Sequence, residues 1–241
     1  MHVFITGATG YVGSAIAASL VRSRHDVTAL VRSTTSAARV ESAGIHAHHG
    51  NLRDPGSYRE ALQSADVIVH TAVEAGDDRI DVDRIFVDAA AGPALIYTSV
   101  MFLLGNVEGA DERAAGQGPR AEHERIVLDA GGAVVRPGMI WGGESFLFEH
   151  PLYIGDGRNR WPLVHRDDVA ELYRLIAESG ARGVFHAVAE VRCAADVFPG
   201  KGVPLEEARE ELGGFADALA LDQDVTAVRS RELGWAPQRF Y

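Results

Sequence analysis

A glycine-spaced turn near the start of the chain constrains the fold more than any other feature. The apolar run Val3–Thr6 is followed by Gly7, Gly10 and Gly13 in the string TGATGYVG, and then by an amphipathic helical pattern. In such a unit the glycines allow a tight turn, close approach of a pyrophosphate, and packing of the helix on its strand, while the helix N-terminus attracts phosphate. The pattern predicts a dinucleotide-binding unit. Its expected cofactor contacts are Thr6, Gly7, Thr9, Gly10, Tyr11, Val12 and Gly13.

Strand-like and helical patterns alternate along the chain and predict an α/β fold. Further strands are expected at Val27–Val31, His46–His49, Asp66–His70, Ala94–Ser99, Ala133–Arg136 and Gly183–Ala187. Helices are expected near residues 35–43, 55–62, 78–91 and 120–130, and from Asp167 or Asp168 onward. Strands separated by helices favour a Rossmann-type, doubly wound parallel sheet.

The composition changes after Pro137, where glycine, proline and aromatic residues become frequent up to Pro162. This segment predicts loops over the carboxyl edge of the sheet, where substrate selectivity would reside. We expect a single domain over residues 1–241. Its nucleotide-binding core would span about 1–137, with a small C-terminal substrate lobe built from elements within about 138–165 and 188–241.

Charge and composition exclude several classes of partner. The 241 residues are 46% hydrophobic and carry a net charge of −11 without a basic cluster, which argues against nucleic acid and anionic membranes. The single cysteine, Cys193, forms no internal disulfide, and the first residues lack a secretion signal. We therefore expect a cytoplasmic enzyme with a small-molecule substrate and no membrane partner; the oligomeric state stays open.

Arg32 directly follows the second expected strand, where the adenosine ribose of a dinucleotide lies. No Asp or Glu stands there to accept the ribose 2′-hydroxyl, and a guanidinium suits a 2′-phosphate, so NADP is favoured and NAD stays possible. The alternative is a solvated surface arginine. Asn51 and Leu52 are expected at the adenine edge and Ala72 beside the cofactor, or else in ordinary strand-end loops.

His46, His48 and His49 raise the question of a metal site, because His46 and His48 share one face of a strand. No carboxylate or cysteine completes a recognisable ligand spacing, so a solvent-facing strand is the better interpretation and no metal is predicted.

Several short strings together resemble the extended and atypical short-chain dehydrogenase/reductases, which include nucleotide-sugar epimerases and dehydratases. They are TGATGYVG (6–13), NLRD (51–54), IYTS (96–99), RPGMIWG (136–142), WPLVHRDDVA (161–170) and LGWAP (233–237). The resemblance implies the Rossmann-type fold, a nicotinamide cofactor, and Pro137 and Gly138 against the nicotinamide. It also implies a structural role for His165.

The catalytic residues of that family are replaced here. The family uses Ser or Thr with a YxxxK pair, whereas the one lysine of this chain, Lys201, is preceded four residues earlier by Val197. The resemblance places Arg120 at the lysine position, Gly116 at the tyrosine position and Val100 at the serine position. The resemblance to the family therefore supports the fold and the cofactor of this chain more strongly than it supports the family's activity.

Another group must then supply the proton that hydride transfer to a carbonyl requires. The candidates are Ser99, Tyr97, Tyr153 and a water held near Arg120. Tyr97 and Ser99 share one side of their strand by spacing, although Tyr97 suits the core and Tyr153 suits the wall of a substrate pocket equally well. Arg120 either reaches the cofactor ribose or pairs with Glu124 at helical spacing.

Three functions remain open on sequence alone. The leading hypothesis is an NADP(H)-binding oxidoreductase or epimerase-type enzyme acting on a small hydroxyl or carbonyl substrate. The second is a non-redox enzyme for elimination, cyclisation or isomerisation on the same fold. The third is an NADP-sensing module without turnover.

Overall fold

The computed structural model describes residues 1–74, 76–92, 94–143, 152–198 and 202–241. Within them, seven parallel strands form one sheet in the order β11-β7-β5-β4-β1-β2-β3. The strands are β1 (His2–Thr6), β2 (Asp26–Val31), β3 (His46–His49), β4 (Val67–His70), β5 (Leu95–Thr98), β7 (Ala133–Pro137) and β11 (Gly183–Ala187). The strand order reverses between β1 and β4, so the expected doubly wound Rossmann-type sheet is confirmed.

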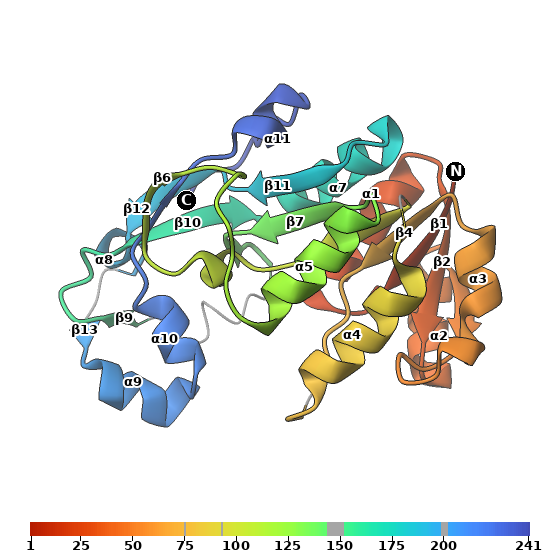
Figure 1. Ribbon diagram of the computed structural model, residues 1–241, viewed down its shortest axis with the longest axis horizontal. Coiled ribbons are helices and arrows are strands. Elements are labelled where there is room, and N and C mark those ends of the chain that lie inside the picture. The colour runs from red at the N-terminus through yellow and green to blue at the C-terminus, as the bar shows by residue number, and fades with distance from the viewer. Residues whose placement is uncertain (75, 93, 144–151, 199–201) are drawn as a thin grey trace.

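Helices cover both faces of this sheet. They are α1 (Tyr11–Arg22), α2 (Thr34–Glu41), α3 (Arg59–Ser64), α4 (Arg79–Ala90), α5 (Pro119–Asp129) and α7 (Arg166–Ser179). Val3 and Ile5 belong to one core with α1, α2 and α7, while Phe4 belongs to a second core with α3, α4 and α5. Successive side chains of β1 thus enter opposite layers, as a strand buried on both faces requires. Figure 1 shows α4 and α5 in front of the sheet.

Small elements of the C-terminal half gather at the carboxyl edge of the sheet. Figure 1 shows the arrowheads of β7 and β11 pointing toward this lobe. Its strands are β6 (Val107–Ala110), β8 (Met139–Trp141), β9 (Tyr153–Ile154), β10 (Arg160–His165), β12 (Glu190–Cys193), β13 (Gly202–Val203) and β14 (Gln223–Val225). Its helices are α8 (Ala194–Val197), α9 (Leu205–Leu212), α10 (Phe215–Leu219) and α11 (Val228–Glu232). A third apolar cluster containing Trp161, Phe198 and Leu219 joins β8, β10, α8 and α10 of the lobe.

Local structure departs from the sequence expectations in three places. Helix α7 begins at Arg166, before Asp167, because the Nδ1 of His165 accepts the Asp167 N–H (3.1 Å) and caps the helix. The expected helix at 55–62 is divided into a 3-10 turn at Pro55–Ser57 and α3. Part of the segment 138–162 forms strands instead of loops, because β8 pairs with β10. Residues 144–151 of that segment, and Lys201, lie outside the described residues.

None of the helices in the described ranges has both the length and the apolar character needed to cross a bilayer.

Candidate nucleotide site and the polar groups beside it

A pocket of about 210 Å³ opens where β1, β2 and β4 end; it is called the glycine-turn pocket below. Its lining residues are Thr6, Gly7, Thr9, Gly10, Leu30, Val31, Arg32, Ser36, Leu52, Thr71, Ala72, Val73 and Glu74. The position is the topological switch point of the sheet, where open α/β folds bind ligands.

Two glycines of the turn, Gly7 and Gly13, are required by its geometry. Gly7 has a φ of +77°, and a Cβ on it would lie 2.6 Å from the Thr71 hydroxyl. A Cβ on Gly13 would lie 2.2 Å from the Gly7 carbonyl oxygen, so α1 presses directly on the turn. Gly10 is the N-cap of α1, and no side chain caps that helix. The N-terminus of α1, the positive end of the helix dipole, therefore lies beside the pocket, where an anionic ligand is favoured.

The structure brings together about half of the residues expected to bind the cofactor. Thr6, Gly7, Thr9, Gly10, Arg32, Leu52 and Ala72 line the pocket. Sequence reasoning missed Leu30, Val31, Ser36, Thr71, Val73 and Glu74. Except for Ser36, which lies in α2, the missed residues lie at or directly after the ends of β2 and β4, so their proximity to strand ends was the signal that would have found them.

The other expected cofactor residues do not line this pocket. The Tyr11 hydroxyl donates to the Gly142 carbonyl (2.6 Å), and Asn51 Oδ1 accepts the Arg53 N–H (3.0 Å). A Cβ on Gly138 would lie 2.5 Å from the Pro162 carbonyl oxygen, so Gly138 backs onto β10. The remaining members of this group are Val12, Gly13 and Pro137.

Arg32 does stand at the mouth of the pocket, but a carboxylate accompanies it. Its Nη1 lies 2.8 Å from Glu74 Oε1, and the Arg32 side chain is 67% exposed whereas that of Glu74 is 14% exposed. The expectation that no acidic residue stands near Arg32 is therefore wrong. Glu74 follows β4, far from Arg32 in sequence, and the sheet order brings the two together.

Thr6 links the pocket to a buried polar cluster, the His–Asp network, formed by Thr6, His70, Asp83, Tyr97 and His123. Thr6 Oγ1 lies 2.7 Å from His70 Nδ1, and His70 Nε2 lies 2.8 Å from Asp83 Oδ1. The other carboxylate oxygen of Asp83 contacts His123 Nδ1 (2.7 Å). Burial alone would raise the pKa of Asp83, but the hydrogen bonds from His123 and His70 hold it below its usual range.

Tyr97 belongs to this network and not to the pocket. It is fully buried, and its hydroxyl donates to Asp83 Oδ2 (2.6 Å). Burial raises the pKa of Tyr97 above its usual range. A phenol that already donates to a carboxylate in the core keeps its proton, so the structure favours the core interpretation of Tyr97 over a role as proton donor.

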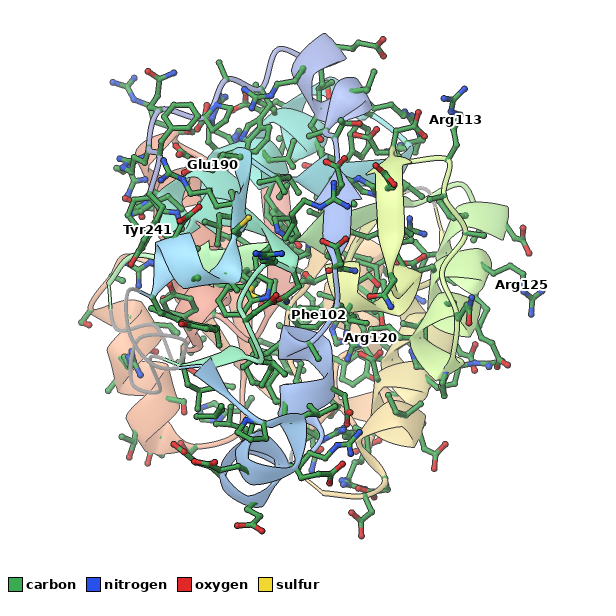
Figure 2. All side chains as sticks on the ribbon, turned by 90° about the vertical axis from the view of Figure 1, so that its left-hand side faces the viewer. Phe102, Arg113, Arg120, Arg125, Glu190 and Tyr241 are labelled. Atoms are coloured by element: carbon green, nitrogen blue, oxygen red, sulfur yellow. The ribbon has the colours of Figure 1, made fainter. Side chains whose placement is uncertain are left out.

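Arg120 and Glu124 do not form the expected pair along α5. Glu124 instead makes a bidentate ion pair with Arg136, at 2.9 Å from Nε and 2.6 Å from Nη2, and both side chains are 3% exposed. Arg120 Nη1 donates to the Thr98 carbonyl (3.2 Å), and its guanidinium lies 6.0 Å from the Tyr97 ring centre. In Figure 2, Arg120 lies within the outline of the molecule, whereas Arg113 and Arg125 project beyond it.

Ser99 and Tyr153 occupy different surroundings. Ser99 follows β5, is buried, and its Oγ has no hydrogen-bond partner among the described residues. Tyr153 lies in the lobe, where a Cβ on Gly202 would come within 2.5 Å of its ring. Tyr153 therefore packs within the third apolar cluster.

At Gly116, where the resemblance places the family tyrosine, a side chain would require Leu103 to move. A Cβ on Gly116 would lie 1.9 Å from Leu103 Cδ1. Leu103 belongs to the 3-10 turn at Met101–Leu104 and is buried in the first core. The loss of the family tyrosine is thus accompanied by apolar packing at the same place.

The histidines of β3 lie at the edge of the sheet. His46 is exposed and lies 3.3 Å from Asp26, while His48 Nε2 lies 2.7 Å from the Ser57 carbonyl oxygen. Their contacts agree with an edge strand that is partly solvated.

Known proteins are similar to this chain both in the segment that forms the pocket and over its whole length. The model of the NAD dependent epimerase/dehydratase family matches residues 3–92, which include every lining residue of the pocket. Uncharacterized protein C2A9.02 of Schizosaccharomyces pombe is 30% identical over 98% of this chain and 95% of that protein. The 2-alkyl-3-oxoalkanoate reductase of Stenotrophomonas maltophilia is 24% identical over 100% of this chain and 83% of that protein. The crystal structure of human epimerase family protein SDR39U1 (isoform 2) with NADPH has a TM-score of 0.76 at 17% identity, covering 98% of this chain and 95% of that one.

Proposed function

Because the chain belongs to the NAD dependent epimerase/dehydratase family, we propose that it is an NADP(H)-binding oxidoreductase or epimerase-type enzyme for a small hydroxyl or carbonyl substrate. The observation that carries this proposal is the glycine-turn pocket, which is lined both by Gly10, the N-cap at the start of α1, and by Arg32. The first suits a pyrophosphate and the second suits a 2′-phosphate. The NADPH in the human structure and the reductase name of the bacterial relative support the same function.

The bound cofactor would supply or accept hydride, and the chain must manage the accompanying proton. Ser99 is the hydroxyl proposed for this step, because its Oγ is buried without a partner among the described residues. Arg120 donates to the carbonyl of the preceding residue, Thr98, so its positive charge lies beside Ser99. A nearby cation stabilises negative charge that develops on an oxygen.

A second candidate function is a non-redox elimination, cyclisation or isomerisation. It is favoured by one observation, the packing of Leu103 against Gly116, the position at which the resemblance places the family tyrosine. Shape and acid–base placement would then carry the reaction.

Calorimetry with NADPH and NADH tests the cofactor assignment. We expect the unmodified chain to bind NADPH more tightly, and Arg32→Ala to remove that preference. Arg39→Ala, in the exposed last turn of α2, is the matched control and should leave both affinities unchanged. NADPH affinity that is unchanged in Arg32→Ala would refute the assignment of Arg32.

Turnover of a panel of carbonyl compounds, followed by absorbance of the reduced cofactor, tests the reaction. Loss of a sole general acid costs about 10²–10⁴-fold in rate, which is the expectation for Ser99→Ala. Tyr97→Phe and Tyr153→Phe should stay within about threefold, since neither phenol is assigned to proton transfer. Conversion of substrate without any change in the cofactor would replace the redox function with the second candidate. Cofactor binding without any turnover would support the sensing module.

A further inference from the structure

Two side chains of opposite charge meet at the adenosine end of the glycine-turn pocket. Arg32 follows β2 and Glu74 follows β4, and their 2.8 Å contact spans the pocket mouth. Glu74 is the less exposed partner, at 14% against 67% for Arg32. The carboxylate therefore lies deeper in the pocket wall than the guanidinium that it holds.

The two groups favour different cofactors. A guanidinium binds a 2′-phosphate, whereas a carboxylate accepts the ribose 2′-hydroxyl and repels a phosphate. In many dinucleotide-binding sheets the acidic residue follows the strand that Arg32 follows here. Glu74 supplies a carboxylate to the same end of the pocket from a different strand.

Arg32 and Glu74 also have different neighbours. Ser36 lines the pocket together with Arg32, and the Ser36 N–H donates to the Oγ of Ser33, the N-cap of α2, at 3.1 Å. Hydroxyl groups and the start of α2 therefore lie on the Arg32 side of the pocket. Near Glu74, the cation Arg53 is already held by both oxygens of Asp78. The pKa of Arg53 is raised, chiefly by its hydrogen bond to Asp78 and also by the charge of Glu74. Arg32 is therefore the cation that contacts Glu74 directly.

We propose that Glu74 determines cofactor selectivity: it accepts the ribose 2′-hydroxyl of NAD(H) and must release Arg32 before Arg32 can bind the 2′-phosphate of NADP(H). This inference rests on the proposed dinucleotide function of the pocket. Arg32 alone would give a strong preference for NADP(H), and Glu74 narrows that preference. The chain therefore accepts both cofactors.

Calorimetry of Glu74→Gln with NADPH and NADH tests this role. The amide keeps the size of the side chain but removes the charge that competes for Arg32. We expect NADPH to bind more tightly and NADH less tightly, with the ratio of the two affinities shifting by about tenfold, the scale of one charged hydrogen bond. Glu41→Gln, at the exposed end of α2, is the control and should leave the ratio unchanged.

The outcomes separate this inference from the proposed function. If Arg32→Ala abolishes the preference for NADPH while Glu74→Gln leaves the affinity ratio unchanged, Glu74 has no part in selectivity and the proposed function stands. If the unmodified chain binds neither dinucleotide, the proposed function and this inference both fall. Glu74→Asp keeps the charge and should keep a ratio closer to that of the unmodified chain than Glu74→Gln does; the reverse order would also overturn the inference.

Discussion

The glycine-turn pocket and the His–Asp network share Thr6, yet they use polar groups in opposite ways. At the pocket α1 begins after Gly10 without a side-chain cap, and Arg32 is largely exposed. In the network both oxygens of Asp83 are hydrogen-bonded, and no member is more than 5% exposed. Groups left available suit a ligand, whereas buried groups that satisfy one another stabilise the fold. The difference assigns binding to the first region and stability to the second.

Asp83→Ala should produce the largest effect that separates the two regions. It would leave His70, His123 and the Tyr97 hydroxyl without their shared buried acceptor. Breaking a buried charged pair from one side costs about 3–5 kcal/mol, so the free energy of unfolding measured with urea should fall by that amount.

The matched control for this variant lies on the same helix. Asp88→Ala removes an exposed carboxylate paired with Arg84, and the loss should be within about 0.5 kcal/mol. A loss below about 1 kcal/mol in Asp83→Ala would mean that the network contributes little to stability.

Gly10→Val should have the reverse profile and damage the pocket alone. A Cβ on Gly10 would lie 3.1 Å from the Gly7 carbonyl oxygen, a tight contact that a small shift of the turn can relieve, and the rest of the side chain would occupy space that the pyrophosphate needs. We expect cofactor affinity measured by calorimetry to fall by at least about 100-fold, equivalent to about 2.7 kcal/mol. The free energy of unfolding should change by about 1 kcal/mol or less, the scale of an N-cap substitution. Normal cofactor binding by this variant would contradict the placement of the phosphates.

Acid should remove the contribution of the His–Asp network to stability. The pKa of Asp83 is lower in the folded state than its ordinary value of 3.8, so its contribution to stability is complete well above that pH. As the pH falls further, the unfolded state takes up the proton first and the contribution is lost, at up to about 1.4 kcal/mol per pH unit. We would measure the free energy of unfolding with urea between about pH 5 and about pH 2 for the unmodified chain and for Asp83→Asn. This free energy should fall less steeply with decreasing pH in the variant. Parallel curves would show that Asp83 does not carry this acid sensitivity.

Features that depend on local sequence patterns could be predicted from the sequence. The sheet and the glycine turn were predictable because each depends on local patterns, such as the apolar runs of β1 and β4 and the spacing of Gly7, Gly10 and Gly13. Half of the candidate site followed from those patterns and from strand ends.

The rest depends on contacts between distant elements. Glu74 reaches Arg32 only because β4 lies next to β1, and Glu124 prefers Arg136 on β7 to Arg120 on its own helix. The spacing of Tyr97 and Ser99 predicts that both lie on one side of their strand, but the Tyr97 hydroxyl donates to Asp83 of α4 in the second core. A single sequence without the strand order contains no local signal for such pairs.

Arg120→Ala should have a small effect on stability and on cofactor binding, and it should show to which region Arg120 belongs. Its contacts in the structure are the Thr98 carbonyl and the Tyr97 ring, and it does not line the glycine-turn pocket. Loss of that hydrogen bond should lower the free energy of unfolding by about 1 kcal/mol and leave the dissociation constants of NADPH and NADH within about twofold. Arg125→Ala, an exposed arginine on the same helix that lies 3.8 Å from Asp129, should change stability by less than about 0.5 kcal/mol. An equal rise in both dissociation constants in Arg120→Ala alone would instead place Arg120 at the ribose, because the ribose next to the nicotinamide is common to the two cofactors.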